Sequence, residues 1–411
     1  MTPATTIGFI GGGQLARMMA ASAIGLGLRV RLLAEESDTS AAGVVPGTMV
    51  GDYTDEKTVA AFADPCEVIT FDHEHVPQPI LRRLLADGVA VRPGPDALIH
   101  AQDKAVMRER LAALGVPCPA FEVVHTPSEL AAAGDRLGWP LVAKVSRGGY
   151  DGHGVWVCDG PAQAGEPFAS RPSPGLGEAD GLGDDGAAES YGAAGGVGTV
   201  VAEERVDFVR ELSALVVRGV DGTLARYPVS ESVQADGMCR ATITPAPIEP
   251  ALAAACLELA ERIAAELGVV GVLAVELMQR RTGGVVVNEL AMRPHNTGHW
   301  TIGGARTSQF ENHLRAVAGL PLGDAGMAVP CAVMANVLGD AERLDVPAWL
   351  ARALAVPGVS VQWYGKGWRP GRKLGHVTAV GEDRAAVVAA ALAALPPGAT
   401  RSLLESVIGG R

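Results

Sequence analysis

Short apolar runs alternate with amphipathic stretches over the first part of the chain. IGFIG is followed by QLARMMAASAIGLG and then by RVRLLA, which predicts strand, helix and strand. The apolar run within CEVITFDHEHVP predicts another strand that leads into a loop, and the proline-containing AVRPGPDALI ends the unit. Strands that alternate with helices predict a parallel sheet, so we expect an α/β domain over residues 1–98.

The mixed pattern continues through residues 99–306, which we assign to a second domain. Met107, Leu111 and Leu114 share one face of a helix predicted over 103–114. A helix near 127–138 separates the strand-like runs FEVV and PLVAKV. Further strands are predicted at GTVVAEERV and RELSALVVRG.

A second long helix begins at Pro250 and ends before Gly268, since proline favours the first turn of a helix and glycine follows the last. Two strands, GVLAVELMQ and GVVVNEL, come next and are joined by RRTG. A last helix, further strands and a basic segment make up residues 307–411, which we assign to a C-terminal domain.

Residues 159–198 break the pattern. This stretch is rich in Gly, Ala, Pro, Ser and acidic residues and offers little to bury. Such a composition favours a flexible surface insertion over catalytic machinery.

Composition narrows the class of protein. The 411 residues carry a net charge of −12, which argues against a nucleic-acid partner because phosphate backbones require clustered Lys and Arg. The six cysteines are scattered without a CxxC pair, which favours a reducing, cytoplasmic setting. No apolar run approaches the roughly 18 residues of a membrane span, and the first residues lack a basic signal-peptide region.

Two acidic residues, Glu276 and Glu289, stand on the two strands joined by RRTG. A tight turn around Thr282 and Gly283 would place them opposite each other, with both side chains on one face of the sheet. Directly opposed carboxylates repel, and a divalent cation such as Mg²⁺ would compensate. The alternative is a half-solvated hairpin whose acids point to water.

Lys144 stands near the end of a predicted strand, shortly before the glycine-rich RGGYDGHG, residues 147–154. A lysine at this place reaches phosphates, and bare backbone N–H groups approach them closely. The sequence lacks the GK[ST] of a Walker A motif, and most glycine-rich turns are only turns. Combined with the paired acids, the loop nevertheless favours ATP with Mg²⁺.

A second glycine-rich turn, GGGQLARM, contains Gly11-x-Gly13-x-x-Ala16 after a strand. This fits the loose dinucleotide-binding pattern, with Glu35 or Glu36 as the ribose carboxylate. An NAD-dependent oxidoreductase therefore remains an alternative. The simpler interpretation is a tight strand–helix turn that binds some other phosphate.

Four cations crowd into eight residues of YGKGWRPGRKLGH. Lys366, Arg369, Arg372 and Lys373 would bind a phosphomonoester well, with Arg able to make bidentate contacts. A solvated basic face is the alternative, although the neighbouring glycines and aromatic residues make it less favourable.

Five stretches together resemble the motifs of the N5-carboxyaminoimidazole ribonucleotide synthetase family. They are IGFIGGGQLARMM, TFDHEHVP, RGGYDGHG, NELAMRPHNTGHWTI and GRKLGHV, in that order. The resemblance covers nearly the whole chain except 159–198. It implies an ATP-grasp fold with an N-terminal Rossmann-like (pre-ATP-grasp) domain, a central ATP-grasp lid and body, and a small C-terminal domain.

The resemblance also implies an activity in purine biosynthesis. ATP would drive the carboxylation of 5-aminoimidazole ribonucleotide (AIR) with bicarbonate through carboxyphosphate, in a cytoplasmic homodimer. Mg²⁺ would be held by Glu276 and Glu289, and the catalytic residues would be Lys144, Tyr150, Asp151 and Arg293. The implied ATP contacts are Lys104, Lys144, Gly148, Gly149, Tyr150, Asp151, Gly152, His153, Gly154, Glu203, Glu204, Arg205, Val206, Glu211, Gln234, Asn288 and Glu289. The implied AIR contacts are Gln14, Glu74, Tyr150, Asp151, His295, Asn296, Lys366, Arg372 and Lys373.

Some positions depart from the common family pattern. Lys104 and Arg108 stand where Arg and Lys are usual, Gln234 replaces a frequent His, and MRPH replaces PRPH. Two further alternatives stay open. Another ATP-grasp enzyme, such as a formate-dependent transformylase or a biotin carboxylase, would keep the paired acids but should lack GHWTI and GRKLGH. A non-catalytic nucleotide-binding regulator should have lost Lys144 or a metal-binding acid.

Overall fold

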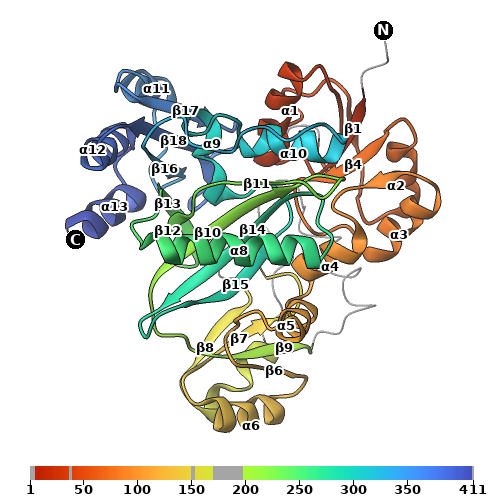
Figure 1. Cartoon of the computed structure of the whole chain (residues 1–411), viewed down its shortest axis with the longest axis vertical. Helices are drawn as coiled ribbons and strands as arrows, with labels where there is room; N and C mark the ends of the chain where they lie inside the picture. The colour runs from red at the N-terminus through yellow and green to blue at the C-terminus, as the bar shows by residue number, and fades with distance from the viewer. Residues whose placement is uncertain (1–4, 37–38, 150–152, 170–197, 410–411) are drawn as a thin grey trace.

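The computed structural model describes residues 5–36, 39–149, 153–169 and 198–409. Three sheets organise it: an N-terminal sheet, a small sheet that projects at one end, and a long sheet through the middle (Figure 1). No helix in these ranges is both long and apolar enough to cross a membrane.

The N-terminal sheet is parallel, as the alternation of strands and helices predicted. Its strand order is β3-β2-β1-β4-β5, and β1 pairs in parallel with both β2 and β4. The strands are β1 (Thr6–Ile10), β2 (Arg29–Ala34), β3 (Thr48–Val50), β4 (Val68–Phe71) and β5 (Ala90–Val91). The helices are α1 (Gln14–Gly25), α2 (Glu56–Ala63), α3 (Gln78–Ala86) and α4 (Pro95–Gln102).

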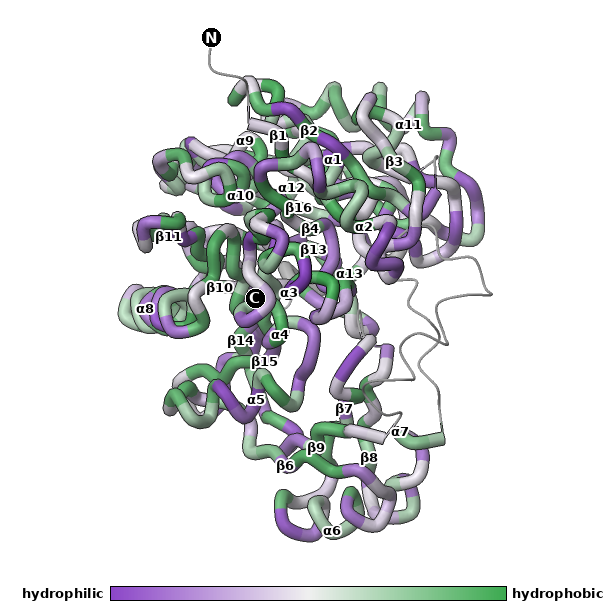
Figure 2. Tube along the Cα trace, turned by 90° about the vertical axis from the view of Figure 1, so that its right-hand side faces the viewer, coloured by the Kyte–Doolittle hydropathy of each residue, from purple (hydrophilic) through white to green (hydrophobic). Residues whose placement is uncertain are grey.

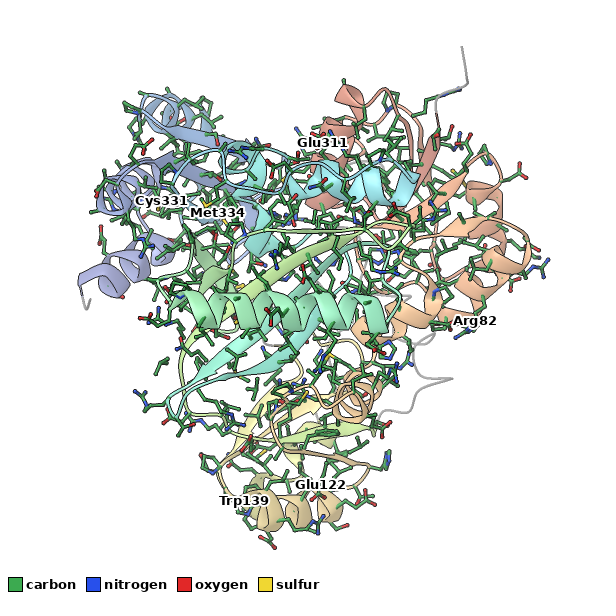
Figure 3. The ribbon with its side chains drawn as sticks, viewed as in Figure 1. Arg82, Glu122, Trp139, Glu311, Cys331 and Met334 are labelled. Carbon is green, nitrogen blue, oxygen red and sulfur yellow. The ribbon has the colours of Figure 1, made fainter. Side chains whose placement is uncertain are left out.

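The small sheet is antiparallel, with the order β6-β9-β7-β8. Its strands are β6 (Phe121–Val124), β7 (Leu141–Val145), β8 (Val155–Cys158) and β9 (Val200–Glu204). Helix α6 (Pro127–Leu137) covers it, and α5 (Lys104–Ala113) connects it to the N-terminal domain. Glu122 and Trp139 mark this projecting part in Figure 3. We refer to it as the lid sheet.

The start of the predicted insertion is folded. Residues 161–169 form the 3-10 helix η1 (Pro161–Gln163) and the short helix α7 (Glu166–Ala169). Ala164 is buried and Phe168 packs against the lid core, which also contains Leu130 and Leu141. The boundary predicted at residue 159 is therefore too early, because alanine, proline and one phenylalanine suffice to pack there. Residues 170–197 lie outside the described residues.

The long sheet has the order β15-β14-β10-β12-β13-β16-β18-β17, and β11 pairs with β10 at its side. Figure 2 shows hydrophobic stretches along these central strands, with more hydrophilic segments at the surface. The strands are β10 (Phe208–Arg218), β11 (Leu224–Arg226), β12 (Ser230–Ala235), β13 (Met238–Thr244), β14 (Gly271–Arg280), β15 (Val285–Ala291), β16 (Cys331–Leu338), β17 (Val359–Trp363) and β18 (Lys373–Gly381).

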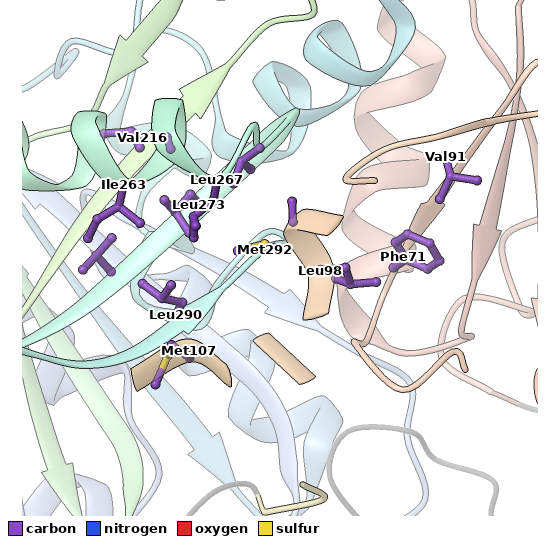
Figure 4. Packing of buried hydrophobic residues seen from close by; sticks show 14 of the residues in the cluster. Phe71, Val91, Leu98, Met107, Val216, Ile263, Leu267, Leu273, Leu290 and Met292 are labelled. Atoms are coloured by element: carbon purple, nitrogen blue, oxygen red, sulfur yellow. The ribbon is translucent and has the colours of Figure 1, made fainter. Parts of the chain in front are cut away.

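Helix α8 (Pro250–Glu266) begins at Pro250 as predicted and covers one face of β10 and β14. The apolar core beneath it contains Ile263, Leu273, Leu290 and Met292, and it extends to Leu98 in the N-terminal domain (Figure 4). Side chains alternate along a strand, so the opposite face of β10 and β14 is left for other contacts.

The chain after residue 306 divides into two parts: residues from 331 on contribute to one apolar core that includes Trp349 and Val387, whereas residues 309–318 pack elsewhere. Helix α10 (Gln309–Ala318), which we assigned to the C-terminal domain, packs against α1 and β14. Strands β16, β17 and β18 extend the central sheet. The remaining described helices are η2 (Asn296–Gly298), α9 (Thr301–Gly304), α11 (Val346–Leu354), α12 (Arg384–Ala394) and α13 (Ala399–Gly409).

Candidate active site

A cavity of about 1440 Å³ lies where the N-terminal domain, the lid sheet and the central sheet meet. Most of the predicted site residues line it. They are Glu74, Lys104, Lys144, Gly148, Gly149, Glu203, Glu204, Arg205, Val206, Glu211, Gln234, Glu276, Asn288, Glu289, Arg293, His295, Asn296 and Lys373. Within the described ranges, Gln14, His153, Gly154, Lys366 and Arg372 are not among its lining residues. Tyr150, Asp151 and Gly152 lie outside the described residues.

The two paired acids face each other as predicted, although the turn differs. Gln279 pairs with Val285, so the turn is centred on Thr282 and not between Thr282 and Gly283 as predicted. A bulge beside Glu276 then restores the pairing of Glu276 with Glu289. The extra residue is Asn288, and a bulge redirects side chains at such a point. Both acids line the cavity, on the face of the sheet opposite α8.

Cations from two other elements reach this face. Lys104 Nζ, at the start of α5, lies 2.6 Å from Glu289 Oε1. Lys144 Nζ, on β7, lies 2.8 Å from Glu203 Oε2 and donates to Asn288 Oδ1 at 3.0 Å. A buried ion pair of this kind persists only where further polar contacts satisfy both partners.

Arg108 supplies those contacts, and sequence reasoning noted it only as a departure from a family pattern. Its guanidinium is fully buried, with Nε donating to Glu203 Oε1 at 2.7 Å and Nη2 to the Asn288 carbonyl at 2.7 Å. Its position on the helix face that carries Met107 and Leu111 was the available signal, since an arginine there must find a buried partner.

The acids of the site titrate differently. Burial and, to a smaller degree, the charge of Glu276 together raise the pKa of Glu211 to about 7. Burial also acts to raise the pKa of Glu289, but the ammonium groups of Lys104 and Lys144 outweigh it and hold that pKa at about 2. Glu289 is thus ionised, while Glu211 crowds a face that is already negative.

The segment 203–207 crosses from the lid sheet to the central sheet. Its acidic side chains are engaged by the protein itself: Glu203 as described above, and Glu204 by Arg280 and by the Ala120 N–H at 3.0 Å. Val206 packs with Met278 and Val286 in a small apolar cluster. The segment therefore presents backbone N–H and C=O groups to the cavity, beside an apolar wall.

The other end of the cavity combines residues of the N-terminal and central domains. Arg293 Nε donates to Glu74 Oε2 at 2.8 Å. His295 Nε2 lies 3.3 Å from Glu276 Oε1, and its Nδ1 is 2.8 Å from Thr297 Oγ1. Among the described residues, Glu74 Oε1 and both polar atoms of the Asn296 side chain are buried without a hydrogen-bond partner. Buried polar atoms of this kind are suited to a ligand.

The basic segment reaches the cavity through one residue. Lys373 is buried at the start of β18 and lines the cavity. Arg372 Nη1 donates to the Gly367 carbonyl at 2.9 Å within the turn, and Lys366 Nζ lies 5.8 Å from the centre of the Tyr364 ring. The segment is therefore not a free solvated face.

The first glycine-rich turn is filled by the protein's own acid. The N–H groups of Gly13 and Ala16, at the start of α1, donate to the carboxylate of Asp72, at 2.9 Å for Ala16. Gly11 has φ +104°, and a Cβ there would lie 2.6 Å from the His73 ring. The helix N-terminus that an NAD pyrophosphate would need is thus already occupied by an anion, which argues against the oxidoreductase.

Family models match the three parts of the chain. They describe a ribonucleotide synthetase preATP-grasp domain over residues 4–102, an ATP-grasp domain over 109–310 and a phosphoribosylaminoimidazole carboxylase C-terminal domain over 332–390. The N5-carboxyaminoimidazole ribonucleotide synthase of Mycobacterium tuberculosis H37Rv is 48% identical, over 93% of this chain and 86% of that protein.

Solved structures agree with these matches. The N5-carboxyaminoimidazole ribonucleotide synthetase of Thermus thermophilus has a TM-score of 0.80 and 35% identity, over 93% of this chain and 96% of that chain. A synthase from Aspergillus clavatus in complex with ADP and AIR has a TM-score of 0.81 and 28% identity, over 99% of this chain and 100% of that chain.

The fold and the cavity define an ATP-grasp ligase with an N-terminal preATP-grasp domain. Its paired acids lie on the central sheet, and Lys104 of α5 and Lys144 of the lid sheet reach the cavity from the other side. The chain belongs to the N5-carboxyaminoimidazole ribonucleotide synthase family, which confirms the predicted fold and activity.

Proposed function

We propose that this enzyme uses the two ends of one cavity for the two halves of its reaction. ATP would lie at the end formed by Lys104, Lys144, Glu211 and the segment 203–207. AIR would lie at the end formed by Glu74, Arg293, His295 and Asn296, with Lys373 at its 5′-phosphate. The observation that carries the proposal is that both sets of residues line the same cavity.

At the ATP end, adenine would bind the backbone of segment 203–207 and the apolar wall of Val206 and Met278. Glu211 would accept hydrogen bonds from the ribose hydroxyls. Lys144 and Lys104 would contact the phosphates, and Gly148 and Gly149 allow a close approach because neither carries a side chain.

The residues also fit Mg²⁺. Glu276 and Glu289 face each other on one side of the sheet, and Glu211 adds to a crowded negative region there. The described residues contain no group of three or more His, Cys, Asp or Glu able to hold a metal, so the remaining ligands would be phosphate oxygens and water. Bound Mg²⁺ would neutralise charge on the transferring phosphoryl group.

The chemistry would proceed through an activated bicarbonate. Bicarbonate is a poor electrophile, so an oxygen of bicarbonate would attack the γ-phosphorus of ATP, releasing ADP and forming carboxyphosphate. The exocyclic amine of AIR would then capture the carboxyl group, and phosphate would leave. Lys144 would stabilise the transferred phosphoryl group, and Arg293 would orient the reacting groups beside Glu74. Tyr150 and Asp151 are proposed as further contacts from the glycine-rich loop.

The experiment is an ADP-release assay with AIR and bicarbonate each present or omitted, together with detection of the carboxylated product. Full ADP release should need both substrates. ADP release that is indifferent to AIR, or stimulated instead by formate and another amine, would contradict the assignment.

We also propose that the enzyme is a cytoplasmic homodimer. Its six free cysteines, five of them buried, fit a reducing compartment. Light scattering of the purified protein should give twice the 42.2 kDa chain mass, and a monomer mass at working concentration would contradict the dimer.

A further inference from the structure

Three strongly polar residues behind the AIR end are buried, although none lines the cavity. Gln309, His299 and His376 are each 0% exposed. His299 and His376 belong to the stretches GHWTI and GRKLGH, and the proposed function gives them no role. Gln309 is the first residue of α10.

Gln309 holds His295 at its backbone. Its Oε1 accepts from the His295 N–H at 2.9 Å, and its Nε2 donates to the His295 carbonyl at 2.7 Å. These two bonds fix the orientation of the amide. The same Nε2 lies 3.2 Å from His299 Nδ1, which must therefore accept, so the neutral ring of His299 carries its proton on Nε2.

His299 in turn stacks on His376, with ring centres 4.8 Å apart and planes 29° apart. His376 Nδ1 lies 2.6 Å from the Tyr364 hydroxyl. Burial lowers the pKa of His376 to about 3 and that of His299 well below its ordinary value, so both rings are neutral near pH 7.

Tyr364 joins the two sides of the basic segment at the base of its loop. Its N–H donates to the Leu374 carbonyl at 3.0 Å, and its own carbonyl accepts from Ser40 Oγ of the N-terminal domain at 2.6 Å. Tyr364 therefore fixes the start of the loop 365–372, which leads to Lys373, to both β18 and the N-terminal domain.

The imidazoles are poor choices for packing alone. The Nε2 atoms of His299 and His376 are buried and have no hydrogen-bond partner within the described ranges. An apolar side chain would fill this space without that unfavourable burial. Departures of this kind from ordinary core composition are expected where a residue serves a site.

We propose that Gln309, His299, His376 and Tyr364 form a positioning chain that fixes the separation between the ring end and the phosphate end of the AIR site. Gln309 acts through His295, and Tyr364 acts through the loop that leads to Lys373. None of the four touches the substrate. The inference rests on the proposed function and adds to it a determinant of specificity for a ligand with a ring and a 5′-phosphate at a set distance.

The test compares Tyr364→Phe with Thr70→Val. Each variant deletes one buried hydroxyl–imidazole contact, since Thr70 Oγ1 lies 2.8 Å from His313 Nε2, away from the cavity. We expect Tyr364→Phe to raise the KM for AIR about three- to tenfold while the KM for ATP stays within about twofold, as fits the loss of one hydrogen bond. Thr70→Val should lower the melting temperature to a similar degree and leave both KM values unchanged.

A second variant tests whether the chain is continuous. Gln309→Met removes the contacts to His295 and His299 with little change in volume. If the four residues act as one unit, the double variant Gln309→Met/Tyr364→Phe should raise the KM for AIR by less than the product of the two single effects. If the increase in the KM for AIR of the double variant equals the product of the two single increases, the two residues act independently and the proposed positioning chain is wrong.

The outcomes separate the inference from the function it rests on. Equal KM values for AIR in Tyr364→Phe and Thr70→Val would overturn the positioning role, even if Gln309→Met fails to fold. A parent enzyme that does not need AIR at all would instead contradict the proposed function.

Discussion

The two ends of the cavity satisfy their polar groups in different ways. At the ATP end, both lysines already have protein partners: Lys104 pairs with Glu289, and Lys144 contacts Glu203 and Asn288. At the AIR end, Glu74 Oε1 and both polar atoms of Asn296 are buried without a partner among the described residues.

The difference indicates that the two ligands bind by different routes. Under the proposed function, ATP and Mg²⁺ would replace existing contacts: Lys104 and Lys144 would exchange a carboxylate for a phosphate, and Glu289 would exchange Lys104 for the metal. AIR, bound as proposed, would meet donors and acceptors that are already in place. The ATP end is therefore sensitive to any change of charge, whereas the AIR end is sensitive to geometry.

The largest effect should come from the paired acids. Glu276→Gln and Glu289→Gln should each lower turnover by on the order of 10³-fold, because phosphoryl transfer loses its charge stabilisation. The ADP-release assay measures this, with circular dichroism as a check on folding and Glu258→Gln, an exposed acid on α8, as the control. Near-normal ADP release in both variants would remove the metal assignment.

The buried cation comes next. Arg108→Met should destabilise the protein by about 3–5 kcal/mol, because Glu203 would keep its buried charge with only Lys144 beside it. Denaturant unfolding measures the change. Arg110→Met, two residues along the same helix and half-exposed, should cost under about 1 kcal/mol. Similar losses in the two variants would mean that the ATP end is not organised around Arg108.

A smaller effect concerns pH. The pKa of Glu211 is raised from 4.5 to about 7, so the folded state holds this proton more tightly than the unfolded state does. Glu211 therefore contributes stability that is complete below pH 4.5 and is lost as pH rises towards 7. Melting temperatures of the parent should fall over this range relative to Glu211→Gln. Parallel curves would show that burial and the charge of Glu276 do not raise the pKa of Glu211.

Local patterns predicted much of this fold. The parallel N-terminal sheet, the helix at Pro250 and the hairpin that carries the two acids all follow from hydrophobic periodicity and short connections. The bulge at Asn288 does not, because it is fixed by contacts with Arg108 and Lys144 from distant elements. With the observed turn and no bulge, Asn288, not Glu289, would lie opposite Glu276, so the opposed acids were predicted from a turn placed half a residue too late.

Long-range contacts also determine which of the two glycine-rich turns is open to a ligand. Both look alike in sequence, but Asp72, directly after β4, fills the first, whereas Gly148 and Gly149 of the second line the cavity. The stack of His299 on His376 likewise joins residues that are 77 positions apart, which no local pattern indicates.

Ligand binding to Lys104→Met and Lys373→Met tests most directly whether the two ends of the cavity bind different ligands. Calorimetry with ADP and Mg²⁺, and separately with AIR, gives two affinities for each variant. Losing one charge-assisted contact should weaken the matching ligand roughly 10- to 150-fold. Lys104→Met should lose affinity for ADP and keep that for AIR, and Lys373→Met should do the reverse. The dephosphorylated nucleoside should bind parent and Lys373→Met about equally. Equal losses for both ligands in both variants would contradict the account.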